Sequence, residues 1–206
     1  MGMKKIDKLK QVCLPKEEFV LPDQLEKLTP AKIKDIEYII VGDNPGEEEH
    51  LLNRYFIGNN TNYIRNFFKT IYGENYEKYV LFLNKTPVYT KRTDLLKGHR
   101  GLGTQEKMAE LIIDIEKRKP VPVWIMGHSH LKDLFKIFWS KIKNMNNLFV
   151  FNHPSRTHFL RDVEKAFGGG RKITKDEFCH FSPKECEKVL KELQREGLKL
   201  GHKEKY

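Results

Sequence analysis

The amino-acid sequence predicts an α/β fold: a three-layer α/β/α sandwich built on a short, four-stranded, mainly parallel sheet. Two observations carry this prediction. Short apolar runs of strand length alternate with longer segments that repeat apolar residues every three to four positions, as parallel strands joined by amphipathic crossover helices do. The chain has 206 residues, of which 39% are hydrophobic. This length and hydrophobic content suffice for one hydrophobic core, so we expect a single domain over residues 1–206.

Four strands are expected, each rich in β-branched or aromatic residues and each followed by a turn-forming residue. They cover Glu37–Val41, Lys78–Asn84, Val121–Gly127 and Asn147–Asn152. The apolar spacing between the strands predicts three helices. They cover Asn62–Ile71, Gln105–Glu116 and Leu131–Ile142.

The two flanks are expected to differ. Residues 1–34 contain three prolines, which predicts an irregular arm with one short helix. The glycine-rich stretch from Phe167 to Phe178 predicts an exposed, flexible loop. Residues 183–206 are expected to form a C-terminal helix and a basic tail, because Ser182 and Pro183 suit the N-cap and first helical positions.

Composition narrows the class of protein. The net charge of +10 suits a polyanion such as nucleic acid, although charge alone does not separate specific binding from solubility. Three cysteines without a CxxC pair argue against a disulfide framework and against a four-thiolate metal or iron–sulfur site. We expect no metal and no cofactor. Without a signal-peptide h-region or an apolar run of membrane-spanning length, we expect a cytoplasmic protein, nucleoid-associated if bacterial. We also expect a monomer.

Two polar loops that follow predicted strands carry a resemblance to a known family. GDNPG, from Gly42 to Gly46, and HPS, from His153 to Ser155, resemble the two signature motifs of the uracil-DNA glycosylase superfamily. Their order, separation and strand-end context agree over roughly residues 36–160. The form Gly-x-Asn-Pro-Gly is similar to the mismatch-specific and single-strand-selective branches.

The resemblance implies an enzyme and a mechanism. The chain would be a monofunctional, metal-free DNA glycosylase that hydrolyses the N-glycosidic bond of uracil, or of a related damaged or mismatched base, in double- or single-stranded DNA. It would flip the base out of the helix and direct water at the sugar, as in base excision repair.

Three side chains are implied as catalytic. Asn44 would orient the attacking water, and His153 would donate a hydrogen bond to the departing base. Asp43 would stabilise the positive charge that develops on the sugar. Structural alternatives remain open: Asp43 pointing to solvent or capping the following turn, and His153 anchoring the loop backbone.

The base-binding residues follow from the same resemblance. Phe56 would stack on the base, and Asn84 would read the uracil edge with its amide. Alternatively, Phe56 is one more core aromatic and Asn84 a turn residue at a strand end. Gly42 and Pro45 would shape the pocket, and Gly46 would leave room for bulkier bases.

The DNA-binding residues are expected in two loops. Arg156 would fill the gap left by the flipped base, and Ser155 would contact phosphate or cap the following helix. The remaining candidates are Thr157, His158, Lys91, Arg92 and Arg100.

Other interpretations stay open. A catalytically inactive, nucleic-acid-binding relative of the same fold would share these motifs. GHSHL resembles a nucleophile elbow with Ser129 as nucleophile, but Leu131 is too large for that strained turn. Lys85 is near enough to the motifs for a Schiff-base step. Glu47 to Glu49 would begin a helix and complement its dipole.

Overall fold

A computed structural model describes residues 19–96, 102–155, 158–167 and 171–200. Its centre is one four-stranded sheet whose strands are all parallel, in the order β2-β1-β3-β4. The strands are β1 (Tyr38–Gly42), β2 (Val80–Asn84), β3 (Val123–Met126) and β4 (Leu148–Phe151). The predicted α/β fold with a short, four-stranded sheet is therefore confirmed, and the ends of each strand lie within two residues of the expected ends.

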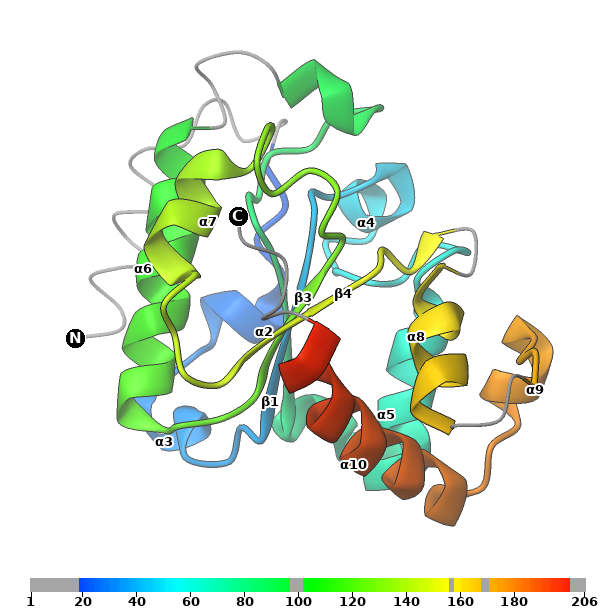
Figure 1. The fold of residues 1–206 in the computed structure, drawn as a ribbon. Helices are drawn as coiled ribbons and strands as arrows, with labels where there is room; N and C mark the ends of the chain where they lie inside the picture. Colours follow the sequence, from blue (N-terminus) through cyan, green and yellow to red (C-terminus); the bar gives the residue numbers. More distant parts are fainter. Residues whose placement is uncertain (1–18, 97–101, 156–157, 168–170, 201–206) are drawn as a thin grey trace.

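Helices cover both faces of the sheet and make the outer layers of a three-layer sandwich (Figure 1). One layer holds α5 (Asn62–Tyr72), α8 (His158–Phe167), α9 (Lys175–Cys179) and α10 (Pro183–Leu200). The other holds α2 (Asp23–Glu26), α3 (Pro30–Ile33), α6 (Leu102–Arg118) and α7 (Lys136–Ile142). Shorter elements are α4 (Glu47–Leu51), η2 (Gly73–Lys78) and η3 (Thr93–Leu96).

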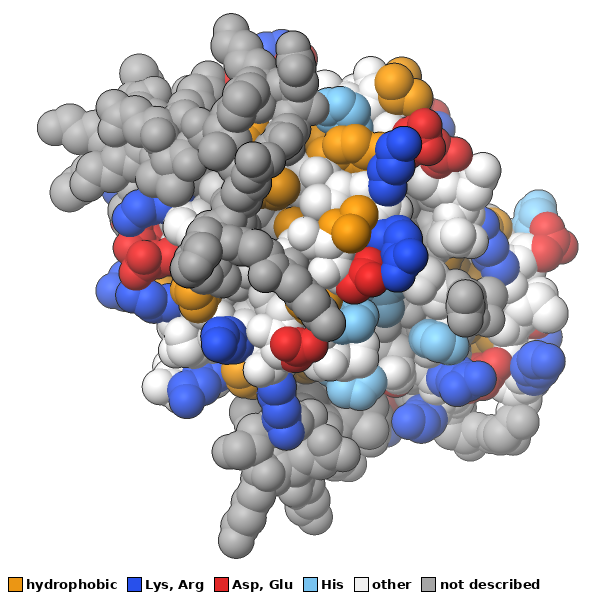
Figure 2. Space-filling view, turned by 90° about the horizontal axis from the view of Figure 1, so that it is seen from above, with side chains coloured by type: hydrophobic (Ala, Val, Ile, Leu, Met, Phe, Trp, Pro, Cys, Tyr) orange, Lys and Arg blue, Asp and Glu red, His pale blue; other side chains and the backbone are white. Residues whose placement is uncertain are grey.

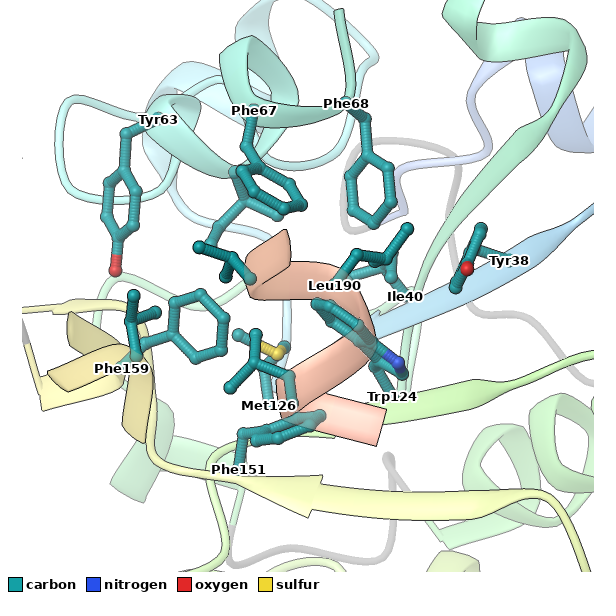
Figure 3. Close-up of a cluster of buried hydrophobic side chains, with 14 of the residues drawn as sticks. Tyr38, Ile40, Tyr63, Phe67, Phe68, Trp124, Met126, Phe151, Phe159 and Leu190 are labelled. Atoms are coloured by element: carbon teal, nitrogen blue, oxygen red, sulfur yellow. The ribbon is translucent and has the colours of Figure 1, made fainter. Parts of the chain in front are cut away.

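Each face of the sheet has its own core because strand side chains alternate between faces. Ile40 and Trp124 pack among aromatic side chains beneath α5, α8 and α10, as Figure 3 shows. Ile39 and Val41 face the aliphatic cluster beneath α6 and α7. Strands buried on both faces read as continuous apolar runs, and this explains why the sequence located them well.

The strand ends lie level with one another. Gly42 at the end of β1 is opposite Asn84 at the end of β2, and Met126 of β3 is opposite Phe151 of β4. The loops that follow all four strands therefore open at one edge, where ligands bind in open α/β sheets. This edge of the sheet carries the candidate site.

Several sequence expectations were wrong in detail. Helix α7 begins at Lys136 rather than Leu131, because turns occupy the start of the segment. The arm has two short helices, α2 and α3, in its described part. The stretch expected as a loop up to Phe178 contains the start of α9, and Phe178 is buried against Phe67 with ring centroids 5.1 Å apart. Residues 168–170 of that stretch lie outside the described residues.

The start of the last helix was predicted well. Glu185 Oε2 accepts a hydrogen bond from the Ser182 backbone N–H at 2.8 Å, and Ser182 Oγ accepts one from the Glu185 N–H at 3.4 Å. This reciprocal pair is a capping box. Within the described part of the chain, no helix combines the length and apolar character needed to cross a membrane.

Candidate active site

A pocket of about 590 Å³ opens at the edge of the sheet where the four strands end. Its walls come from the loop after β1, the end of β2, the loop after β4, helix α4 and the segment from Phe56 to Thr61. Figure 2 looks down on this edge and shows histidine side chains gathered at its centre. The two loops that carry the family resemblance thus lie in one pocket.

The close approach of β1 and β2 forms one wall of the pocket. A Cβ on Gly42 would overlap with Asn84 Oδ1 and lie 3.0 Å from Phe56 Cζ, so a larger residue here would displace the Asn84 amide. Asn84 is 2% exposed, and its Nδ2 has no hydrogen-bond partner among the described residues. A buried amide donor without a partner is costly in a folded protein. The pocket therefore offers an unused donor beside an aromatic ring.

Phe56 is both a core residue and part of the pocket wall. It is 2% exposed, and its ring packs against Phe82 with centroids 5.5 Å apart. Its φ of 58° is unusual for an aromatic residue and costs energy. The buried Glu49 carboxylate stabilises this backbone by accepting hydrogen bonds from the N–H of Phe56 and, at 2.8 Å, from that of Gly46.

The glutamates after β1 have more than one function. They occupy the first turn of α4, where acidic residues complement the helix dipole, as expected. Burial raises the pKa of Glu49, and its two backbone donors oppose that shift. Glu48 accepts hydrogen bonds from the backbone and side chain of Asn59 at 3.1 and 3.3 Å, and Lys175 of α9 donates to the Asn59 carbonyl. The rim of the pocket is thereby tied to two helices.

His153 has its two ring nitrogens in distinct roles. The Ser155 backbone N–H donates to Nδ1 at 3.1 Å, and Ser155 Oγ lies 2.7 Å from the same nitrogen. Because Nδ1 accepts, the neutral ring carries its hydrogen on Nε2. Nε2 lies 3.8 Å from Asp43 Oδ2. Burial lowers the pKa of His153 despite the nearby Asp43 carboxylate, so the neutral donor form is favoured.

Two buried side chains hold the HPS loop in place. The Tyr63 hydroxyl donates to the Pro154 carbonyl at 2.9 Å. Asp162 of α8 accepts from the backbone and the side chain of Asn152, both at 2.7 Å. Helices α5 and α8 therefore position the loop that carries His153.

Asp43 is buried between two other side chains of the site. It is 6% exposed, and its carboxylate forms an ion pair with Lys85 while facing His153. The alternative that Asp43 points to solvent or caps the turn is wrong. Gly127, with a φ of +90°, lies against Asp43 and His153. A Cβ at Gly127 would be 2.9 Å from Asp43 Oδ1 and 3.0 Å from His153 Cδ2.

Asn44 lines the pocket, and hydrogen bonds to neighbouring residues fix the orientation of its side-chain amide. Its Nδ2 donates to Thr90 Oγ1 at 3.0 Å and to the Pro45 carbonyl at 3.2 Å. Thr90 Oγ1 in turn donates to the Arg92 carbonyl at 2.9 Å, so it must accept from Asn44. The Asn44 Oδ1 is thus the atom suited to accept a hydrogen bond from water.

Some of the residues expected to contact DNA lie in the described part of the chain, and others lie outside it. Lys91 is exposed and lines the pocket, whereas the guanidinium of Arg92 is paired with Asp94. His158 is the first residue of α8, next to the HPS loop. Arg100, Arg156 and Thr157 lie outside the described residues.

The structure also bears on the rival chemistries. Turns follow Ser129 and α7 starts only at Lys136, so the sharp strand-to-helix turn of a nucleophile elbow is not formed. Lys85 has no exposed surface, so its amine cannot reach a sugar in the pocket to form a Schiff base. Among the residues described, no group of three or more His, Cys, Asp or Glu side chains could hold a metal ion.

Sequence reasoning missed several residues that build the site. Tyr63, Thr90 and Gly127 were not given a role, Glu49 was expected only to begin a helix, and Lys85 was considered only for a Schiff base. A signal existed for Glu49, since its position three residues after Gly46 is capping-box spacing. Thr90 and Tyr63 act through contacts 46 and 91 residues away in sequence, which no local pattern reveals.

Comparison with known proteins agrees with this geometry. A search of curated proteins found no match. The family model described as the Uracil DNA glycosylase superfamily matches residues 31–167. That range contains all four strands and every residue that lines the pocket. Because the match covers well over half of the sequence, the chain belongs to the uracil DNA glycosylase superfamily.

Proposed function

We propose that this chain is an active, monofunctional DNA glycosylase that removes uracil, or a related damaged or mismatched base, from DNA. Family membership supports DNA glycosylase activity in general and DNA as the partner. The observation that carries the finer proposal is the buried Asn84 amide, whose Nδ2 has no partner among the described residues, in the same pocket as His153.

The pocket has the polar atoms that uracil needs. Asn84 Nδ2 can donate to O4 of the base while Oδ1 accepts from N3–H, and the Nε2–H of His153 can donate to O2. Phe56 supplies an aromatic surface beside the amide. A buried site built to hydrogen-bond a substrate discriminates strongly against bases that leave its groups unpaired.

The chemistry is hydrolysis of the bond between the base and C1′ of the sugar. The bond breaks first, its electron pair leaves with the base, and the sugar becomes a cation resembling an oxocarbenium ion. His153 stabilises the negative charge on O2 of the leaving base, and the Asp43 carboxylate stabilises the cation. A water held by Asn44 Oδ1 then bonds to C1′ and loses its proton to solvent, while the base takes up a proton.

The range of substrates is proposed to be broad. A Cβ on Gly46 would meet only Glu49 Oε2, at 3.9 Å, so side chains do not crowd the pocket at this position. This openness is consistent with the mismatch-specific and single-strand-selective branches that the GDNPG motif resembles. We propose that bases larger than uracil can enter.

The test is a cleavage assay. Single- and double-stranded oligonucleotides that carry one uracil, hypoxanthine or mismatched thymine are incubated with the protein, and abasic sites are cut with hot alkali. We expect product from at least one substrate, with a loss of about 100-fold or more in His153→Ala and of about 30-fold in Asn84→Ala. The exposed Asn75→Ala is the matched control.

One outcome would support the inactive relative instead. DNA binding with no abasic product from any base, while the protein is folded, would refute the glycosylase proposal. Product that is unchanged in His153→Ala and Asn84→Ala would refute the assignment of the site.

A further inference from the structure

Lys85 is enclosed beneath the candidate pocket. It follows Asn84 directly at the end of β2, and none of its surface is exposed. Its Nζ lies 4.9 Å from the centre of the Phe135 ring. Its backbone N–H also donates to the carbonyls of Gly42 and Asp43, at 2.9 and 3.0 Å. Both the backbone and the side chain of Lys85 therefore contact the loop after β1.

The contacts of Lys85 Nζ identify its charge state. It donates to Asp43 Oδ1, to the Met126 carbonyl at 2.8 Å and to the Gly127 carbonyl at 3.0 Å. Three acceptors need three hydrogens, and only the ammonium form has three. Burial lowers the pKa of Lys85, and the Asp43 carboxylate opposes that shift. The geometry fits a buried ammonium–carboxylate pair.

The pair joins three neighbouring strands at the floor of the site. Asp43 follows β1 and Lys85 follows β2, while the two carbonyls belong to Met126, the last residue of β3, and to Gly127 after it. With Oδ1 bound to Lys85, Asp43 Oδ2 is the oxygen that faces His153 Nε2. A buried carboxylate without such a cation would take up a proton or turn toward water.

We propose that Lys85 is a positioning residue for the glycosylase reaction, because its buried ammonium keeps Asp43 ionised with Oδ2 directed at the reacting sugar and His153. This inference rests on the proposed function, in which the Asp43 charge stabilises the sugar cation. Lys85 acts only through Asp43 and does not touch the DNA. If Lys85 only filled space in the core, removing its positive charge would not change the charge state of Asp43.

The test is the pH dependence of Lys85→Met, which keeps the length of the side chain and removes its charge. At pH 7 we expect single-turnover cleavage to fall about 100-fold, with affinity for DNA changed less than about threefold because Lys85 is buried. The rate should recover as the pH rises toward 9, because a buried, unpaired carboxyl ionises only at higher pH.

Two controls isolate the role of charge. Lys78→Met removes the ammonium of an exposed pair, 3.6 Å from Asp35, and should leave the rate unchanged at every pH. Lys85→Met with Asp43→Asn has no carboxyl to ionise, so its rate should stay low at every pH. A loss in Lys85→Met that is the same at pH 7 and pH 9 would overturn the inference.

A second measurement does not depend on activity or on the variant folding. In ¹⁵N spectra of the wild-type protein with labelled lysine, Lys85 should give an ammonium signal at pH 7 with slow hydrogen exchange. A neutral amine signal would overturn the inference. An inactive wild-type protein would refute the proposed function, whereas an active protein with a pH-independent loss in Lys85→Met would refute only the role of Lys85.

Discussion

Gly42→Ala tests whether the close contact between β1 and β2 forms the base-reading part of the site. A Cβ at Gly42 would overlap with Asn84 Oδ1 and approach Phe56 Cζ to 3.0 Å. The Asn84 amide is the end of a side chain and can swing away, whereas the backbone of β1 is paired on both sides. We therefore expect Asn84 to move while the fold persists.

The magnitude follows from the two hydrogen bonds that a displaced Asn84 amide can no longer make to the base. Two neutral hydrogen bonds at roughly 1 kcal/mol each amount to about 2 kcal/mol, or about a 30-fold fall in kcat/KM. Overpacking should also lower the free energy of unfolding by about 1–3 kcal/mol. Gly46→Ala is the matched control in the same motif, because its Cβ would meet only Glu49 Oε2 at 3.9 Å.

The assay compares single-turnover cleavage and thermal melting for both alanine variants. The double variant Gly42→Ala, Asn84→Ala should be no slower than Asn84→Ala alone, since both changes remove the same interaction. Gly42→Ala that cleaves within about threefold of Gly46→Ala would refute the reasoning, since a reduction of about 2 kcal/mol in transition-state stabilisation is expected. So would a double variant in which the two rate reductions simply multiply.

Three further predictions concern the supports of the site. Tyr63→Phe removes the hydrogen bond to Pro154 and should cost about 1 kcal/mol, lowering Tm by about 2–4 °C in a chain of this size; an unchanged Tm in a melting experiment would contradict it. Glu49→Gln cannot accept from both the Gly46 and Phe56 N–H groups, so Tm should fall by about 4–10 °C. The exposed Glu47→Gln loses only a helix-dipole interaction and should lower Tm by less. Because burial lowers the pKa of His153, the neutral donor form persists below pH 6.5, and cleavage should remain active there. The neutral His153 also stabilises the fold above pH 6.5, and this contribution is lost as the pH falls through the lowered pKa of His153 in the folded protein. A rate already halved at pH 6.5 or above would argue against this assignment.

The sheet and the place of the site could be predicted from the sequence because they depend on local patterns. Ile39, Ile40 and Val41 form a run that suits a strand covered on both faces. A loop such as GDNPG after that run must lie at the carboxyl edge of a parallel sheet. The start of α7 was misjudged because Leu131 and Leu134 are buried within turns, and periodicity does not separate buried turns from a helix.

The details of the site could not be predicted because they depend on partners distant in sequence. Asp43 was open to three interpretations until Lys85, 42 residues away, was seen to bind its carboxylate. Phe56 as base contact and Phe56 as core residue were treated as alternatives. The structure places Phe56 in the core and in the wall of the pocket at once, because the pocket wall is the surface of the core, so the two interpretations are compatible.

The sequence by itself determined the α/β class, the four strands and the loops that hold the candidate site, because hydrophobic periodicity and turn residues act over short distances along the chain. Only the tertiary structure decided which atoms face one another: the tautomer of His153, the orientation of Asn44, and the burial of Lys85. These depend on hydrogen bonds and on burial, which arise when separate strands and helices pack together.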